Sequence, residues 1–422
     1  MGHSMGGAGA WMIGLHYPDR FGSITPIDPA MGFDDELAHV DELPAWMRPQ
    51  TVMFKQDNLF PNARNVLVYL KNAGNGIQQD STAFTDGIIA AGGFSTTEFF
   101  PGMPHYWARE LSHAMFTGQA TMVPTPASPP EIKFFTNTLR YNRAYWATID
   151  QLAAPATTAS LHVTYDDGIP APLPPTPFNR GRPQPPRTPP TLVVTTENIS
   201  ALTLRLGDAG ITPATMPPLT IDGSVIAPSE LSATVHLART ESTWQVVADA
   251  TPAPGTKHHG MQGPIGDAIT SPFLAVYRDA PADKALAIVE LDAIRNPATR
   301  LVIHGEFPMK PASSVTAEDI ATKNLLLFGS VATHPLLRRY APQLPASLMA
   351  DPGVVFIHPN PESPAHYIVV WTAPVLSVAD NTLRAGYIQP INLLPDYVRV
   401  HDGAITDAGH FSNMWSLPPA RP

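Results

Sequence analysis

Residues 2 to 6 read Gly2-His3-Ser4-Met5-Gly6 and fit the pattern G-x-S-x-G. In this pattern a sharp turn between a strand and a helix holds the central serine in a strained conformation, and small neighbours let the backbone pass closely. Residues 8 to 17 then carry apolar side chains at helical spacing, and residues 21 to 27 read as a short buried strand. We therefore expect part of an α/β sheet, with Ser4 as the candidate nucleophile.

A family resemblance rests on two runs of residues. GHSMGGAGAWMIGLHYPDRFGSITPIDPA, residues 2 to 30, resembles the elbow-to-next-strand stretch of prolyl-oligopeptidase-like serine hydrolases, a group that includes bacterial esterases. AGGFSTTEFFPGMPHYW, residues 91 to 107, resembles the strand and loop that deliver the catalytic histidine of that family. The resemblance implies an α/β-hydrolase fold and acyl-enzyme chemistry over about the first quarter of the chain.

His105 is the candidate general base. A serine hydroxyl is a weak nucleophile until an imidazole accepts its proton and later returns it to the leaving group. The loop Pro101-Gly102-Met103-Pro104-His105 follows a predicted strand, where such a histidine is expected. The backbone N–H of Met5, directly after the nucleophile, is the expected donor to the oxyanion.

The third member of the triad is left open by the sequence. The resemblance places an acid after the strand Val66 to Leu70, but Asn75 stands at that position. An amide can orient an imidazole but cannot stabilise its charge. Asp28, after the strand that follows the elbow helix, and Asp80, in the same loop as Asn75, are the alternatives. Asn75 is the first choice of the three.

The position of the motif adds a further expectation. In an α/β-hydrolase several strands precede the elbow, whereas only Met1 precedes it here. We therefore expect a partial hydrolase sheet without its N-terminal strands, and a chain that is inactive or poorly soluble unless the missing part is supplied. An export signal would then lie upstream, and the resemblance suggests a bacterial secreted or periplasmic protein.

Composition excludes several partners. The 36 acidic and 26 basic side chains give a formal charge of −10 without like-charge blocks, which argues against binding nucleic acid or an anionic membrane. Cysteine is absent, so disulfides and thiolate chemistry are excluded. No apolar run reaches the length of a membrane span. The expected partner is a small-molecule or polymer-linked ester or a peptide.

Three domains are predicted. Residues 1–120 form the hydrolase part, residues 131–255 an antiparallel β-module with a proline-rich insertion at 169–190, and residues 256–422 a small parallel α/β subdomain. In the third domain, continuous apolar strands, including residues 299–303, alternate with helices. The β-module is expected to brace its neighbour or to bind carbohydrate.

Neither a cofactor nor a metal is predicted. The loop 329–334 lacks a phosphate-binding lysine, and the adjacent His258 and His259 do not have the spacing of metal ligands. Three functions remain: a carboxylic ester hydrolase, with polysaccharide esters as one candidate substrate; a prolyl-oligopeptidase-type serine peptidase; and a non-catalytic relative that binds a ligand or partner.

Overall fold

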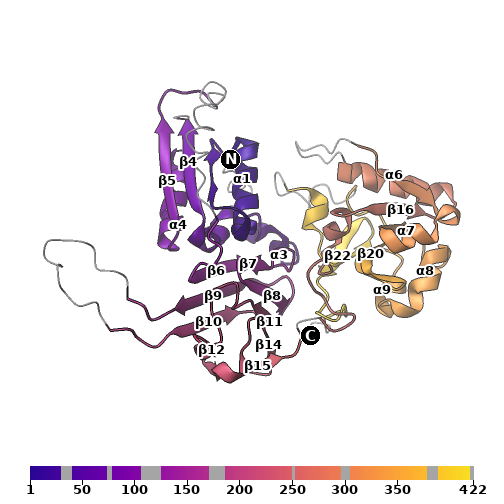
Figure 1. Cartoon of the computed structure of the whole chain (residues 1–422). Helices are drawn as coiled ribbons and strands as arrows, with labels where there is room; N and C mark the ends of the chain where they lie inside the picture. Colours follow the sequence, from indigo (N-terminus) through magenta and orange to yellow (C-terminus); the bar gives the residue numbers. More distant parts are fainter. Residues whose placement is uncertain are drawn as a thin grey trace.

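The computed structural model describes residues 1–29, 40–73, 78–105, 125–170, 186–249, 252–295, 305–377 and 388–418, with the side chains of residues 78–80 left out. Several sheets and helices make up a mixed α/β structure, which confirms the predicted class. Figure 1 shows three bodies, with the first above the second and the third beside them. Asn75 and the predicted strand 299–303 lie outside the described residues.

The first body contains a parallel sheet. Its order is β1-β3-β4-β2, with β5 also paired to β4, and every pairing is parallel. The strands are β1 (Gly2–His3), β2 (Ser23–Ile24), β3 (Pro26–Ile27), β4 (Leu67–Ala73) and β5 (Phe94–Phe100). Because parallel strands end at the same edge, the residues that follow β1, β3 and β5 meet there.

Helices α1 (Met5–His16) and α4 (Gln78–Ala90) pack on this sheet and share its core. The short helix α3 (Arg48–Thr51) instead contacts the 3₁₀ helices η2 (Val40–Glu42) and η8 (Pro390–Leu393). Trp11 and Leu15 of α1 pack in one cluster with Val68 and Leu70 of β4 and with Ile88 of α4. The predicted helix 8–17 is thus confirmed, and it begins three residues earlier, directly after Ser4.

The second body is a β-sandwich of two five-stranded sheets. Their orders are β13-β12-β10-β9-β6 and β15-β14-β11-β8-β7, and one hydrophobic cluster fills the space between them. Among the strand pairings described in this sandwich, only β10–β12 is parallel. The strands are β6 (Glu131–Thr136), β7 (Arg143–Ala144), β8 (Ala147–Leu152), β9 (Ala159–Asp166), β10 (Thr191–Glu197), β11 (Ile199–Leu204), β12 (Leu219–Ile221), β13 (Ser224–Ile226), β14 (Val235–Thr240) and β15 (Thr243–Val247).

The third body has a mixed sheet of order β17-β16-β18-β20-β19-β21-β22. The strands are β16 (Phe273–Tyr277), β17 (Met309–Pro311), β18 (Asn324–Phe328), β19 (Val354–Asn360), β20 (Ser363–Trp371), β21 (Tyr397–His401) and β22 (Ala404–Gly409). The helices are α6 (Pro281–Arg295), α7 (Ala317–Thr322), α8 (Pro335–Tyr340) and α9 (Ala346–Met349).

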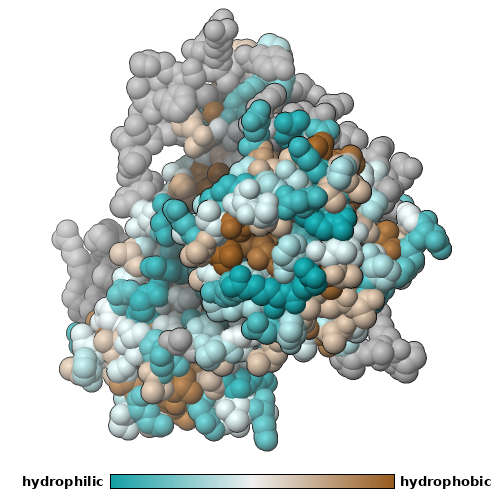
Figure 2. Space-filling view, turned by 90° about the vertical axis from the view of Figure 1, so that its right-hand side faces the viewer, coloured by the Kyte–Doolittle hydropathy of each residue, from teal (hydrophilic) through white to brown (hydrophobic). Residues whose placement is uncertain are grey.

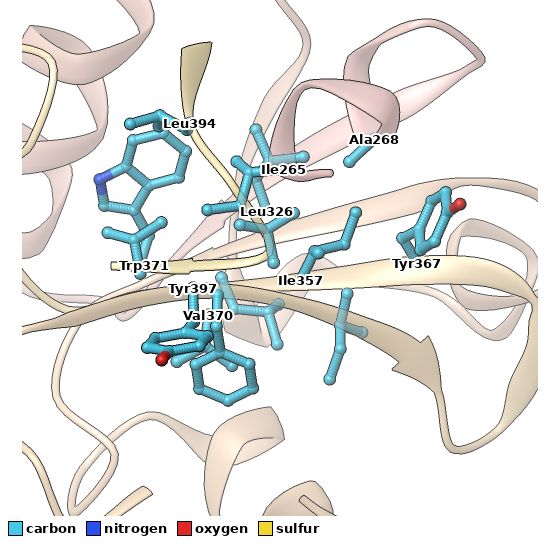
Figure 3. Packing of buried hydrophobic residues seen from close by; sticks show 14 of the residues in the cluster. Ile265, Ala268, Leu326, Ile357, Tyr367, Val370, Trp371, Leu394 and Tyr397 are labelled. Carbon is cyan, nitrogen blue, oxygen red and sulfur yellow. The ribbon is translucent and has the colours of Figure 1, made fainter. Parts of the chain in front are cut away.

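The prediction of a parallel subdomain is correct only for half of this sheet. Pairing is parallel from β17 to β20 and antiparallel from β20 to β22. A continuous apolar strand indicates burial on both faces of the sheet, but it does not indicate the direction in which the strand pairs. Strand β19 joins β20 through a turn of two residues, which requires an antiparallel pair. Figure 3 shows Ile357 of β19 and Val370 of β20 among the buried side chains of the core.

The outer face of the third body is mostly polar. Figure 2 views the molecule from this side and shows teal residues around a small brown cluster. Among the described residues no helix is long and apolar enough to cross a membrane.

One buried amide ties the first body to the sandwich. Asn62 lies in the 3₁₀ helix η3 (Gln56–Asn65) and is 1% exposed. Its Nδ2 donates to the carbonyl oxygens of Leu15, at 2.9 Å, and Phe135, at 3.1 Å. Its Oδ1 accepts from the backbone N–H of Phe135, at 2.6 Å. The last turn of α1 and strand β6 therefore share one side chain.

Candidate active site

Ser4 sits in the turn between β1 and α1. Its φ of 55° and ψ of −121° are unusual for a residue with a side chain, which marks a strained position. The N–H of Ser4 donates to the carbonyl of Ile27 at 2.9 Å, and its own carbonyl accepts from the N–H groups of Gly7 and Ala8. The turn is therefore fixed to β3 on one side and to the first turn of α1 on the other.

The glycines in and directly after the motif differ in whether the structure leaves room for a side chain. A side chain on Gly2 would overlap the carbonyl of Gly6, and one on Gly7 would come within 3.0 Å of the Ile27 carbonyl oxygen and of Pro29. A side chain on Gly6 would meet nothing within 4 Å. Close backbone approach thus requires glycine at residues 2 and 7.

His105 lies beside Ser4. It follows β5 in the loop that the sequence predicted, and its Nε2 is 2.8 Å from the hydroxyl oxygen of Ser4. The histidine side chain is 32% exposed, so it borders both the protein interior and the solvent. The structure brings together these two sequence-predicted residues, which are 101 positions apart.

Asp28 occupies the other side of the imidazole. Its Oδ2 is 2.7 Å from Nδ1 of His105, and the residue is fully buried. Asp28 follows β3 and adopts a left-handed φ of 43°. Its Oδ1 accepts from the N–H of Ala73 at 3.2 Å, and its own N–H donates to the carbonyl of Lys71 at 2.6 Å. The carboxylate is thus held against the end of β4.

The other candidates for the acid take no described part in the site. Asn75, the first choice from the sequence, lies outside the described residues. The backbone of Asp80 belongs to α4, and its side chain is among those left out. Of the three alternatives, Asp28 is the one whose carboxylate the structure places on His105.

The hydrogen bonds assign the tautomer of His105. The Asp28 oxygen is a carboxylate acceptor, so its contact with the ring assigns the proton to Nδ1. Nε2 is then unprotonated and accepts from the Ser4 hydroxyl. This arrangement can remove the serine proton while the new imidazolium faces a negative charge.

Met5 begins α1 directly after Ser4. The N–H groups of the first helical turn have no partner within their own helix and carry the positive end of the helix dipole. The Met5 N–H is therefore a suitable donor to an oxyanion formed at Ser4. Its side chain is 63% exposed.

His3 is a site residue that the sequence analysis missed. Its Nε2 donates to the carbonyl oxygen of His105 at 2.6 Å, and the two rings are 4.9 Å apart. The one sequence feature that points to His3 is that it fills the variable position directly before Ser4 in the G-x-S-x-G pattern. His3, Asp28 and His105 each offer a possible metal-ligand atom within 4.8 Å of the others. We assign no metal, since both ring nitrogens of His105 already contact Asp28 and Ser4.

A cavity of about 520 Å³ lies along α1 and is lined by all three bodies. The first body contributes Met5, Met12, Ile13 and Met53, and the second contributes Leu139, Tyr141 and Leu152. Polar residues of the third body form the remaining wall: Lys257, Gln262, Asp267, Asp396 and His410. Figure 1 shows α1 on the side of the first body that faces the third.

His16 and Asp396, both on the cavity, have strongly shifted pKa values. Burial lowers the pKa of His16, at the end of α1, to about 4. Burial raises the pKa of Asp396, but the charge of Lys257, followed by that of His410, outweighs this effect and brings the pKa to about 2. Lys257 and Asp396 form an ion pair in which both side chains are almost completely buried.

Comparison with known proteins supports a hydrolase. Residues 1–90 match the family model Esterase, described as "Putative esterase". The matched segment contains Ser4 and Asp28 and ends before His105. It supports an esterase-type enzyme of the α/β-hydrolase kind that acts on a small-molecule substrate. The search of curated proteins found no match.

Proposed function

We propose that the protein is a serine esterase that hydrolyses carboxylic esters through an acyl-enzyme. The observation that carries the proposal is the hydrogen-bonded chain from the Ser4 hydroxyl through His105 to Asp28, with distances of 2.8 and 2.7 Å. Nucleophile, base and orienting acid at hydrogen-bond distance are the arrangement that acyl transfer needs.

The first half of the reaction forms the acyl-enzyme. The Ser4 oxygen attacks the ester carbonyl carbon while its proton moves to Nε2 of His105. Negative charge develops on the carbonyl oxygen, towards which the Met5 N–H can donate. The tetrahedral intermediate then breaks its bond to the alcohol oxygen, which takes the proton from His105 and leaves.

The second half returns the enzyme to its starting state. Water attacks the acyl carbon, gives one proton to His105 and forms a second tetrahedral intermediate. Its collapse breaks the bond to the Ser4 oxygen, which regains the proton from His105 and releases the acid. In both halves the buried carboxylate of Asp28 faces the imidazolium and stabilises its charge.

The choice of an ester over a peptide bond follows the description of the matched family. The triad geometry suits both bonds, so the prolyl-oligopeptidase-type activity is an outcome that the experiment must separate. Polysaccharide esters are one group of possible substrates. The third alternative, a relative that binds but does not react, would leave Ser4 unreactive.

The test is labelling with a fluorophosphonate, which modifies activated serines, together with hydrolysis of chromogenic esters and peptide anilides. We expect labelling and acetate ester hydrolysis, both lost in Ser4→Ala and retained in Ser224→Ala, a serine change in the sandwich. Cleavage of anilides without esters would instead favour a peptidase. Absence of labelling in folded protein would contradict the proposed mechanism.

A further inference from the structure

Helix α1 is apolar on every side. Among its 12 residues only the last, His16, has a polar side chain. A helix with this composition is usually buried all round. Trp11 and Leu15 pack into the core of the first body, but Met5 and Ile13, on another side of the helix, are 63% and 55% exposed. Helix α1 therefore has a second apolar surface that does not pack on the sheet.

The cavity of about 520 Å³ lies along this second surface. Met5, Gly9 and Ile13 follow one another at intervals of four residues, share one side of α1 and all line the cavity. A side chain added at Gly9 would meet nothing within 4 Å, so the cavity reaches the backbone in the middle of the helix. The volume falls within the range of roughly 300–1,000 Å³ that is usual for small-molecule sites.

The lysine, arginine and aspartate side chains of the wall neutralise one another. Arg140 pairs with Asp267, and Lys257 pairs with Asp396. Asp267 also accepts from the Tyr367 hydroxyl at 2.7 Å, so its carboxylate is already well satisfied. A charged ligand would lose its hydration shell without gaining an unpaired counter-charge from the described part of this wall. The wall therefore favours an uncharged ligand.

The apolar wall combines thioether and aromatic side chains, which are those of Met5, Met12, Met53, Tyr17, Phe54 and Tyr141. Tyr141 stacks on His16, another wall residue, with ring centres 4.0 Å apart, and its ring contacts that of Tyr17 edge-on at 5.4 Å. Thioether sulfurs make favourable contacts with aromatic rings, and pairs of rings gain free energy beyond their buried area. This wall therefore favours a ring over an alkyl group of equal size.

We propose that the cavity is a binding site for an uncharged aromatic small molecule, separate from the triad. Neither Ser4 nor His105 is among the described residues of its wall. All three bodies contribute to the wall, so a bound molecule would contact each of them. The inference thus gives the second and third bodies a role in binding that does not depend on the esterase proposal.

The first experiment compares two glycines of α1. N-Phenyl-1-naphthylamine is an uncharged aromatic probe that fluoresces in apolar sites, and we expect it to bind at a single saturable site. Gly9→Leu fills the cavity from the helix. Gly6→Leu is the matched control, since a side chain at Gly6 also meets nothing within 4 Å and Gly6 is not among the described wall residues.

We expect the Kd of the probe to rise about tenfold or more in Gly9→Leu and to change little in Gly6→Leu. Circular dichroism checks that both variants are folded. Equal affinities of the two variants, or binding at many weak sites, would overturn the assignment.

The second experiment tests the ligand class in the unmodified protein. 8-Anilino-1-naphthalenesulfonate has the same rings as the probe and adds a negative charge, and we expect it to bind about tenfold more weakly or worse. 2-Naphthol should displace the probe at a lower concentration than its saturated counterpart, decahydro-2-naphthol. A sulfonate that binds as tightly as the probe would refute the preference for an uncharged ligand. Equal displacement by the two alcohols would refute the preference for a ring.

The third experiment separates this site from the triad. Ser4→Ala should bind the probe with an unchanged Kd, and the probe should leave the KM for an acetate ester unchanged in the unmodified protein. Loss of binding in Ser4→Ala, or competition with the ester, would place the probe at the triad and reject a separate site. Protein that binds the probe but hydrolyses no ester would retain the cavity assignment and reject the esterase alone.

Discussion

Asp28 Oδ2 lies 2.7 Å from His105 Nδ1, although 77 residues separate the two in the chain. The contact arises because β3 and β5 both pair in parallel with β4 and so end at the same edge of the sheet. The left-handed φ of Asp28 turns the chain at this edge, and the Ala73 N–H holds the second carboxylate oxygen.

Asp28→Asn should abolish most activity without unfolding the protein. Asparagine tolerates a left-handed φ and can still accept from Ala73, but it would present its amide to His105 and reverse the tautomer. We expect kcat on an acetate ester to fall by about 10³ to 10⁴-fold, as carboxylate loss does in serine hydrolases generally. Steady-state kinetics and circular dichroism test this.

Asn75→Ala is the complementary variant. Since Asp28 already contacts Nδ1 of His105, we expect kcat to stay within about threefold of the unmodified protein. A large loss in Asn75→Ala together with full activity in Asp28→Asn would show that Asp28 has no catalytic part.

The two glycines of the motif should respond differently to alanine. Gly2→Ala forces its new side chain against the Gly6 carbonyl, whereas Gly6→Ala adds one to open space. We expect Gly2→Ala to lower the free energy of unfolding by about 1–3 kcal/mol, the usual cost of overpacking, and Gly6→Ala to change it little. Thermal unfolding followed by fluorescence distinguishes the two, and equal midpoints would contradict the steric argument.

His3 should act as a positioning residue for His105. His3→Phe removes the donor to the His105 carbonyl, and His3→Gln retains one. We expect kcat to fall about two- to tenfold in His3→Phe, the value of one hydrogen bond, and to recover largely in His3→Gln. KM should change less than kcat. Equal activity of all three proteins would remove His3 from the site.

The third body should lose stability in acid through His334. This residue is fully buried, caps α8 and accepts from the Leu337 N–H at 3.4 Å, which requires an unprotonated ring. Burial lowers its pKa to about 4 from an ordinary value of 6.5. Because the unfolded state binds the proton first, the stabilisation is complete above pH 6.5 and is lost as the pH falls towards 4.

His334→Asn tests this, since asparagine also caps helices but does not titrate. The histidine contribution amounts to about 3 kcal/mol across that range. We expect the free energy of unfolding, measured in urea, to change less between pH 7 and pH 4 in the variant than in the unmodified protein. Parallel pH profiles of the two proteins would show that His334 takes up its proton at the same pH in the folded and the unfolded state.

Substitution of only one partner of the Lys257–Asp396 ion pair should strongly lower the free energy of unfolding. Lys257 is 2% exposed and also lies 4.8 Å from the ring centre of Trp415. Asp396→Asn leaves this ammonium group buried without a counter-charge, and we expect a loss of about 3–5 kcal/mol. Adding Lys257→Met should restore part of the stability. A double variant less stable than Asp396→Asn would contradict this.

Much of the fold could be predicted from local pattern. The elbow at Ser4, the apolar stripe that became α1 and the alternating strands of the sandwich are properties of short segments, so periodicity reveals them. The direction of β19 was not visible in the same way. A buried strand has the same composition in parallel and antiparallel sheets, and only its short turn to β20 determines the pairing.

The candidate site was harder to complete from sequence. Ser4 and His105 belong to motifs, but the position of an acid depends on where a strand ends and how the chain turns there. Strand β4 runs to Ala73, three residues beyond its predicted end, and Asp28 reaches His105 through a left-handed turn. Neither property has a signature in one sequence, nor does the contact of His3 with the His105 carbonyl.

We expect the contacts of Asn62 to make the geometry of the candidate site depend on the sandwich. Its side chain joins the carbonyl of Leu15 to both backbone groups of Phe135, and so it anchors the far end of α1, the helix whose first residue follows Ser4. Because α1 is a continuous helix, a displacement at its C-terminal end also moves its N-terminal end. Random mutagenesis scored by ester hydrolysis should therefore yield loss-of-function changes in β6, far from Ser4. Exchange of the sandwich for another should retain activity only when the contacts between Asn62 and β6 are kept.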